Sequence, residues 1–203
     1  MKQKVDIKDF ISNIPEFLKT EQNLAPWELT SNLKNIIEKI LPQLATEFKI
    51  EDGIAIHKSV IIEKGVTIKK PFIAMENCRI GANAYFREGV FLDKSVKIGP
   101  SSEIKSSIIC AETAIAHLNY IGNSIIGQKV NFEGGSIAAN HYNERTDKRI
   151  LVKHENTVID TGVEKFGALV GDDSRIGANA VLSPGTILEK KSIVKRLELI
   201  EQQ

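Results

Sequence analysis

Three basic side chains recur at a constant spacing along the chain. Lys69, Arg87 and Lys105 are 18 residues apart in turn, and each directly follows an apolar residue of a regular pattern. If the chain forms coils of 18 residues, the three side chains stack one strand apart, about 4.8 Å in the backbone. Stacked like charges repel one another. Since Arg and Lys bind phosphate strongly, an anion over this row would offset the repulsion. A solvated basic stripe is the alternative interpretation.

One histidine stands in the same kind of position as these cations. His117 also follows a residue of the pattern, two repeat units after Lys105, so we expect it on a different face. With coils of 18 residues, its equivalents on that face are Glu63, Gly81 and Gly99, and the two glycines leave room for a ligand. A neutral imidazole can accept a proton near pH 7. A surface histidine without a chemical role is the alternative.

The remaining histidines and cysteines do not form a metal-binding pattern. His57, His141 and His154 are scattered without an H-x-x-x-H or H-x-x-x-x-H spacing. Cys78 and Cys110 are the only cysteines. The sequence therefore predicts neither a zinc site nor a disulfide framework.

A six-residue period positions these candidate residues. Eleven successive positions of this period are Ile56, Ile62, Ile68, Ala74, Ile80, Phe86, Leu92, Ile98, Ile104, Cys110 and Ala116. The period returns at Ile126 and Phe132, and again over residues 170–194. Hexapeptide repeats are typical of a parallel β-helix. Each unit is a short strand plus a corner, and three units close a triangular coil. We expect this mainly β fold over residues 54–203.

Two interruptions break the period. The step from Ala116 to Ile126 is ten residues, and the step from Phe132 to Val170 contains a polar, irregular segment. We expect a loop at about residues 139–165. An irregular loop on a rigid coil is a common place for a site, although a tolerated surface insertion has the same pattern.

Residues 1–53 are expected to form an N-terminal helical cap. Apolar residues recur there at spacings of three and four, namely Ile7, Phe10, Ile11, Ile14, Phe17 and Leu18, then Leu33, Ile36, Ile37, Ile40, Leu41 and Leu44. Pro26 suits a first helical turn and Pro42 would end the second helix. Packing against the β-helix would stabilise these helices, and we expect them to cover an exposed sheet edge.

The overall charge excludes some classes of partner. Lys and Arg number 27 and Asp and Glu number 26, which gives a formal charge of +1. This balance argues against nucleic acid or an anionic membrane as a partner. No apolar run approaches the ~20 residues of a membrane span, and the first residues lack the apolar core of a signal peptide. We expect a cytoplasmic protein. Outward apolar residues such as Ile61, Ile73 and Phe91 predict burial against neighbouring copies, as in a cyclic homotrimer.

Four segments resemble one known family. They are His117-Leu118-Asn119-Tyr120-Ile121-Gly122, Ile126-Gly127, Asn131-Phe132-Glu133-Gly134-Gly135-Ser136-Ile137 and Asn140. The acetyltransferase domain of the bifunctional N-acetylglucosamine-1-phosphate uridyltransferase/glucosamine-1-phosphate acetyltransferase has the similar pattern H-L-x-Y-x-G-D, I-G, N-I-G-A-G-T-I and N. Residues 159–162 and 165–172 resemble archaeal-type sugar-1-phosphate nucleotidylyltransferases with acetyltransferase tails. The resemblance covers about residues 55–195, and residues 1–50 are too short for a nucleotidyltransferase domain.

The resemblance implies a left-handed β-helix and a homotrimer with its sites between subunits. Its implied roles divide among acceptor, base and co-substrate. The acceptor residues are Arg87 and Lys105 for the sugar phosphate and Tyr120 and Asn131 for the sugar. The catalytic residues are His117 as general base and Asn140 in a positioning role. The residues implied to contact acetyl-CoA, the co-substrate, are Gly134 and Asp172, the latter standing where the family has a serine.

The expected function is transfer of an acetyl group from acetyl-CoA to the amine of a glucosamine-1-phosphate-like sugar. The sequence departs from the family at Asn123, which replaces an aspartate, and at residues 133–135, where Glu-Gly-Gly replaces G-A-G. Two alternatives therefore stay open. One is a transferase acting on a nucleotide-linked sugar or another acceptor, and the other is a non-catalytic trimer that binds sugar phosphates.

Overall fold

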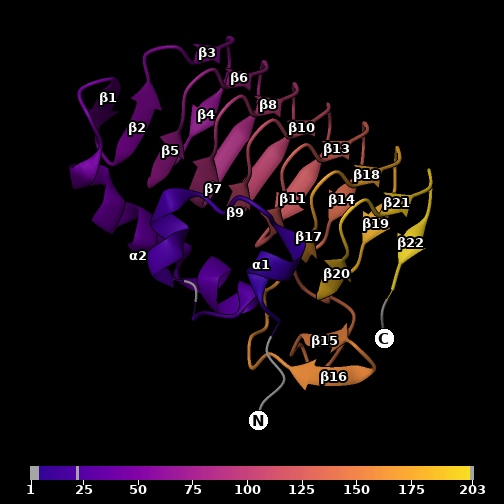
Figure 1. Ribbon diagram of the computed structural model, residues 1–203. Helices are drawn as coiled ribbons and strands as arrows, with labels where there is room; N and C mark the ends of the chain where they lie inside the picture. The colour runs from indigo at the N-terminus through magenta and orange to yellow at the C-terminus, as the bar shows by residue number, and fades with distance from the viewer. Residues whose placement is uncertain (1–4, 22, 202–203) are drawn as a thin grey trace.

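The computed structural model describes residues 5–21 and 23–201, which form a triangular parallel β-helix with a helical N-terminal segment (Figure 1). The mainly β fold predicted from the repeats is confirmed. Short parallel strands stack coil upon coil in three faces, and corners join one face to the next.

Each face is a stack of seven strands, to which the long strands β7 and β9 contribute twice because they bend around a corner. The first face contains β2 (Ile54–His57), β5 (Phe72–Ala74), the C-terminal parts of β7 (Tyr85–Leu92) and β9 (Glu103–Ile109), β12 (Ile125–Ile126), β17 (Ala168–Val170) and β20 (Thr186–Leu188). The second contains β3 (Ile61–Ile62), β6 (Arg79–Ile80), β8 (Lys97–Ile98), β10 (Ala114–Ile115), β13 (Asn131–Phe132), β18 (Arg175–Ile176) and β21 (Ile193–Val194). The third contains β4 (Thr67–Ile68), the N-terminal parts of β7 and β9, β11 (Tyr120–Gly122), β14 (Ile137–Ala138), β19 (Val181–Leu182) and β22 (Leu199–Ile200).

Residues of the six-residue period fill the interior of the coils. Phe86, Leu92 and Ile104 are fully buried there, and the rings of Phe72 and Phe86 lie 5.0 Å apart between centroids. Burial of this continuous column of β-branched and aromatic side chains stabilises the coil through the hydrophobic effect.

The period slips once, at a corner where the sequence pattern gave no sign of it. Arg87 pairs with Lys105 and Val90 pairs with Ser107, so two corner residues in one coil face a single residue in the next. The Ser107 hydroxyl closes the shortened corner by donating to the Lys105 carbonyl at 2.6 Å and accepting from the Ser124 N–H at 3.0 Å. Coils after this point are 17 residues long, as the pairing of Ile108 with Ile125 shows.

The slip overturns three expectations. Ile109 and Ile115 occupy the interior in place of Cys110 and Ala116, which makes the last two positions of the predicted period wrong. The step from 116 to 126 is no interruption, because Ile121 fills the interior between them. Gly99 is also not the equivalent of His117, since a Cβ at Gly99 would come within 2.5 Å of the main chain of Ala116.

The N-terminal segment contains α1 (Ile7–Phe10), η1 (Glu16–Glu21), α2 (Pro26–Ile40) and η2 (Leu41–Gln43). As predicted, α2 begins at Pro26, and it ends before Pro42. The buried side chains of α2 include Trp27, Leu33 and Ile37. The side chains of Phe17 and Leu18, which the periodicity also named, lie outside the described residues.

The helices cover the first face and not an edge of the sheet (Figure 1). Ile73 and Phe91 point outward from that face and are buried in one cluster with α2. These two residues therefore do not support a homotrimer, whereas Ile61 is 55% exposed. The edge of the first coil is covered by β1 (Phe48–Glu51), which pairs antiparallel with β2.

The predicted loop is an excursion between β14 and β17 that contains its own hairpin. Strands β15 (Leu151–His154) and β16 (Thr157–Asp160) pair antiparallel. The excursion packs against the N-terminal segment through ring contacts of Phe10 with His154 at 5.8 Å and of Trp27 with Phe166 at 5.9 Å. Among the described helices, none is long and apolar enough to cross a membrane.

Candidate functional site

Two of the three predicted cations are direct neighbours in adjacent coils. Arg87 of β7 pairs with Lys105 of β9 in the third face. Lys69 continues the row, because the residue before it pairs with the residue before Arg87. Lys105 is only 4% exposed, whereas Lys69 is exposed. The predicted stacking is thus present, and it buries one ammonium group at the corner between the third and first faces.

Carboxylates of the same chain contact the two stacked cations. The Arg87 guanidinium donates to Glu103 through Nε and to Glu88 through Nη1, both at 2.7 Å. The second oxygen of Glu88 lies 3.2 Å from Lys105 Nζ. Neither carboxylate was predicted from the sequence, where only the repulsion along the row was considered. These contacts offset part of that repulsion without any ligand.

The environment lowers the pKa values of both Lys105 and Glu88. Burial lowers the pKa of Lys105, and the charges of Lys165 and Arg87 add to this, although the bond to Glu88 opposes it. Burial alone would raise the pKa of Glu88, but hydrogen bonds and charges from Lys105 and Arg87 outweigh it and lower the pKa. The ammonium and the carboxylate are therefore electrostatically coupled.

Tyr120 and Asn140 lie at the same corner. A Cβ at Gly122 would meet the Tyr120 hydroxyl at 2.6 Å and the Asn140 side chain at 2.9 Å, so glycine leaves space for both. Asn140 Nδ2 donates to Asn123 Oδ1 at 2.7 Å. Burial is the largest cause that raises the pKa of Tyr120, followed by the charge of Glu103. Asn123, where the family has aspartate, thus orients Asn140.

The excursion brings a third cation to this corner. The Phe166 N–H donates to the Asn140 carbonyl at 3.0 Å, and the Gly167 N–H donates to the Asn123 carbonyl at 3.0 Å. These bonds return the chain beside Gly122, and the charge of Lys165 acts on Lys105. Lys165 belongs to a motif that resembles the family, but no role was predicted for it. We call the group Arg87, Glu88, Glu103, Lys105, Tyr120, Asn123, Asn140 and Lys165 the cationic corner.

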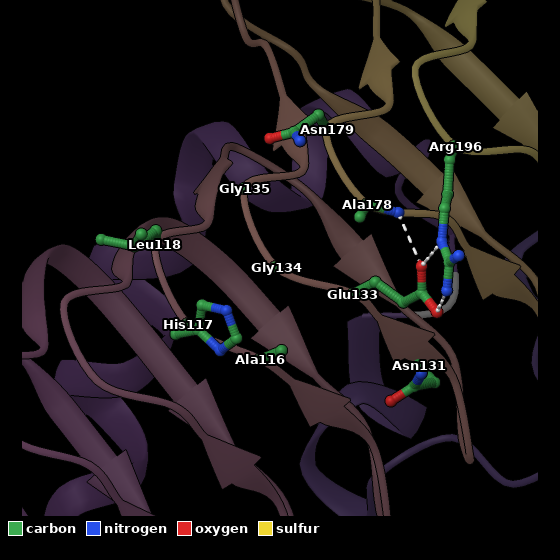
Figure 2. Close-up of a pocket in the computed structure, with 10 residues that line it drawn as sticks. All are labelled: Ala116, His117, Leu118, Asn131, Glu133, Gly134, Gly135, Ala178, Asn179 and Arg196. Carbon is green, nitrogen blue, oxygen red and sulfur yellow. Dashed lines mark hydrogen bonds and ion pairs between the residues drawn. The ribbon is translucent and has the colours of Figure 1, made fainter.

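His117 lies in a different place, in a groove of about 590 Å³ at the corner between the second and third faces (Figure 2). We call it the histidine groove, and it is lined by Ala116, His117, Leu118, Asn131, Glu133, Gly134, Gly135, Ala178, Asn179 and Arg196. The His117 side chain is exposed and lies against Gly134. A Cβ at Gly134 would come within 2.6 Å of His117 Nε2, so glycine at 134 makes room for the imidazole.

Glu133 at the edge of this groove is a structural latch. Its carboxylate accepts from the Ala178 N–H at 2.9 Å and from two Arg196 nitrogens at 2.9 and 3.0 Å (Figure 2). The bond to Arg196 lowers the pKa of Glu133 to about 2. Glu63 accepts from the Ala82 N–H in the same way at 2.9 Å, far from His117. The departure from G-A-G at 133–135 therefore matches a corner that the chain also uses elsewhere.

A second, adjoining groove of about 480 Å³ extends toward the C-terminal coil. It shares Asn131, Glu133 and Arg196 with the histidine groove, and it adds Arg175 and Lys195. This end of the second face is therefore basic, whereas the part beside His117 is lined mainly by small residues.

The structure does not bring Asp172 to either group. Asp172 is 6% exposed, and its carboxylate accepts from the N–H groups of Ser12 and Gln128, both at 2.8 Å. Ala178, six residues later, is the residue that lines the groove with His117 and Gly134. The acetyl-CoA contact expected at Asp172 stays a prediction without geometric support, and Ala178 was not predicted from the sequence.

The candidate residues thus divide between two faces of one chain. His117 and Asn131 belong to the second face and the corner after it, whereas Arg87, Lys105, Tyr120 and Asn140 gather at the far edge of the third. Lys105 pairs with Gly122, which is five residues after His117 and so on the order of 15 Å away along the strand. One small acceptor cannot contact both groups of side chains within one chain. Among the described residues, no group of His, Cys, Asp and Glu could hold a metal ion.

Comparisons with known proteins agree with this architecture. The family described as "Hexapeptide repeat of succinyl-transferase" matches residues 76–99 and 168–195. The "Bifunctional protein GlmU" of Methanococcus vannielii is 36% identical over 175 residues, which cover 83% of this chain and 41% of that protein. The protein of the same name from Methanocaldococcus jannaschii is 34% identical over 79% of this chain and 40% of its own length.

A third relative has a more explicit name. The "Bifunctional sugar-1-phosphate nucleotidylyltransferase/acetyltransferase" of Sulfurisphaera tokodaii is 34% identical over 142 residues, which cover 67% of this chain and 35% of that protein. The chain spans about two-fifths of the length of the relatives it matches. We conclude that the chain is a hexapeptide-repeat β-helix protein of the family that includes the acetyltransferase domain of the bifunctional GlmU proteins.

Proposed function

We propose that the protein transfers an acetyl group from acetyl-CoA to the amine of a sugar phosphate resembling glucosamine-1-phosphate. The observation that carries this proposal is the cationic corner, where Arg87, Lys105, Tyr120 and Asn140 meet with one buried ammonium group. Relatives with acetyltransferase in their names supply the reaction type.

The cationic corner would bind the acceptor. Arg87 and Lys105 are paired across adjacent strands, and they can donate charge-assisted hydrogen bonds to one phosphate group. Lys165 adds a positive charge beside them. Tyr120 and Asn140 offer a hydroxyl and an amide for the sugar hydroxyls, and Asn123 fixes the orientation of Asn140.

His117 would act as the general base. An amine bound as ammonium cannot attack a thioester until it loses a proton, and His117 Nε2 faces the groove beside Gly134. The amine nitrogen would then form a bond to the thioester carbonyl carbon while the C–S bond breaks. The proton accepted by His117 would pass to the departing thiolate, which leaves as free coenzyme A.

The histidine groove and its basic extension would hold acetyl-CoA. Ala116, Gly134 and Ala178 give the part beside His117 a narrow lining suited to a thin chain. Arg175, Lys195 and Arg196 lie toward the other end, where the phosphates of coenzyme A need cations. In this arrangement Gly134 contacts the co-substrate and Asn131 lies between the two ends.

The two groups would complete one site only between chains. We propose a cyclic homotrimer in which the third face of one chain meets the second face of its neighbour. Exposed apolar side chains at these faces, including Ile61, Ile193 and Leu199, would be buried there. Light scattering tests this arrangement, because a stable monomer of 22.5 kDa at micromolar concentration would contradict both the trimer and the shared site.

The experiment that tests the function is a panel of amino-sugar phosphates with acetyl-CoA, followed by release of free thiol. Turnover with a phosphorylated amino sugar, but not with the same sugar lacking the amine, would support N-acetylation. Binding of these sugars without thiol release from any of them would instead support a non-catalytic sugar-phosphate-binding trimer.

A further inference from the structure

The Glu88 carboxylate occupies the position where an anion would bridge Arg87 and Lys105. One oxygen lies 2.7 Å from Arg87 Nη1 and the other lies 3.2 Å from Lys105 Nζ. A phosphate group offers the same arrangement, in which two oxygens of one anion each accept from a different cation. The chain thus supplies its own anion to the two donors that face the candidate acceptor site.

The two cations are held more firmly than the carboxylate. The Lys105 side chain is 6% exposed, and Arg87 keeps a second bond from Nε to Glu103. The Glu88 side chain is 54% exposed. Its backbone lies at a corner where Glu88 and Gly89 both have positive φ, at 60° and 90°. Glu88 can therefore swing into solvent while the donors stay in place.

We propose that Glu88 is a tethered competitor, which an acceptor must displace from Arg87 and Lys105 before its own anionic group can bind. This inference rests on the acceptor end of the proposed function and adds its substrate class, a dianionic phosphate monoester. A dianion outcompetes the single charge of Glu88, whereas a monoanionic carboxylate gains little by replacing another carboxylate. Glu88 therefore sets a preference for phosphorylated acceptors.

The size of the effect follows from the population of the open state. Apparent affinity falls by the fraction of molecules in which the anion position is free. An exposed ion pair holds its closed form weakly, but here one partner is almost buried and the carboxylate bridges two cations. We expect Glu88→Gln to tighten phosphate binding by about 5- to 20-fold.

The test is isothermal titration of the full chain with inorganic phosphate at pH 8, where phosphate is mainly a dianion. Glu88→Gln is compared with Glu76→Gln as a matched control. Glu76 forms a similar pair with Lys94 at 2.8 Å, so its variant removes the same charge from a carboxylate–lysine contact that does not touch Arg87 or Lys105. Glu88→Ser serves as a second variant, and thermal unfolding confirms that each variant is folded.

The proposal predicts tighter phosphate binding in both Glu88 variants, a change of less than about twofold in Glu76→Gln, and little gain for acetate in any of them. Unchanged or weaker phosphate binding in the folded Glu88 variants would overturn it. Equal tightening in Glu76→Gln would also overturn it, because net charge would then explain the effect. These outcomes are independent of acetyl transfer, since the thiol-release assay alone decides whether the proposed reaction occurs.

Discussion

Substitution of Gly134 by alanine should disable His117 without unfolding the coil. The added Cβ would come within 2.6 Å of His117 Nε2 and within 3.0 Å of Cδ2. An ordinary contact begins near 3.4 Å, so the ring must move by about 0.8 Å. A displacement of about 1 Å in a catalytic group can cost about 100-fold in rate. We therefore expect a loss of turnover of roughly 10- to 100-fold.

The backbone itself should accept alanine at this corner. The chain repeats the corner at residues 63–65, where a lysine stands between Glu63 and Gly65 in the place of Gly134. Because His117 is exposed, its ring can move aside, and the melting temperature should change little. Lys64→Ala changes the equivalent residue in the other corner and serves as the control.

The assay is thiol release with saturating acetyl-CoA and the best acceptor from the panel, with melting temperatures measured in parallel. We expect slow turnover in folded Gly134→Ala and normal turnover in Lys64→Ala. If Gly134→Ala keeps more than half of the wild-type rate, glycine is not needed there to place the imidazole.

Three further predictions address other parts of the structure. Arg87→Ala should weaken binding of the phosphorylated acceptor by roughly 1.5–3 kcal/mol, the range for charge-assisted hydrogen bonds; calorimetry should show almost unchanged acetyl-CoA binding, and equal loss for both ligands would indicate damage to the fold. Asp172→Ala leaves the N–H groups of Ser12 and Gln128 without their acceptor, so denaturant unfolding should show a loss of about 1–3 kcal/mol, whereas a selective loss of acetyl-CoA affinity would restore the role expected from the sequence. Since the Arg196 contact lowers the pKa of Glu133 to about 2, its contribution is present above the ordinary value near 4.5 and is lost as pH falls toward 2; the melting-temperature difference between wild type and Glu133→Gln should therefore shrink from pH 6 to pH 2, and a constant difference would count against this contact.

The repeats were sufficient to predict the coil, because a six-residue period of apolar residues fits neither the period of a helix nor that of a flat sheet. They could not predict the register everywhere. One residue is absent at the corner formed by Ser106, and Ser107 closes that corner with side-chain hydrogen bonds. A single deletion of this kind leaves apolar residues such as Cys110 and Ala116 at the expected spacing while Ile109 and Ile115 fill the interior.

The site was only partly predictable for a different reason. Arg87 and Lys105 stack as expected, since both precede the deletion. Lys165 reaches the same corner only through the bonds that return the excursion to Asn123 and Asn140, and no local pattern encodes those bonds. Asp172 was assigned from a nearby motif, but the residue that lines the groove with Gly134 is Ala178, a small residue without a distinctive signal.

The central claim is that one site combines the cationic corner of one chain with the histidine groove of another. Mixing two inactive variants tests it most directly. His117→Ala should lose about 10²–10⁴-fold in rate as a missing general base, and Arg87→Ala should be nearly inactive at low acceptor concentration. When the two are co-refolded, random trimers contain sites with an intact His117 from one chain and an intact Arg87 from its neighbour. We predict recovery to about a quarter of the wild-type rate. A co-refolded mixture of folded trimers that is no more active than its separate components would contradict a site shared between chains.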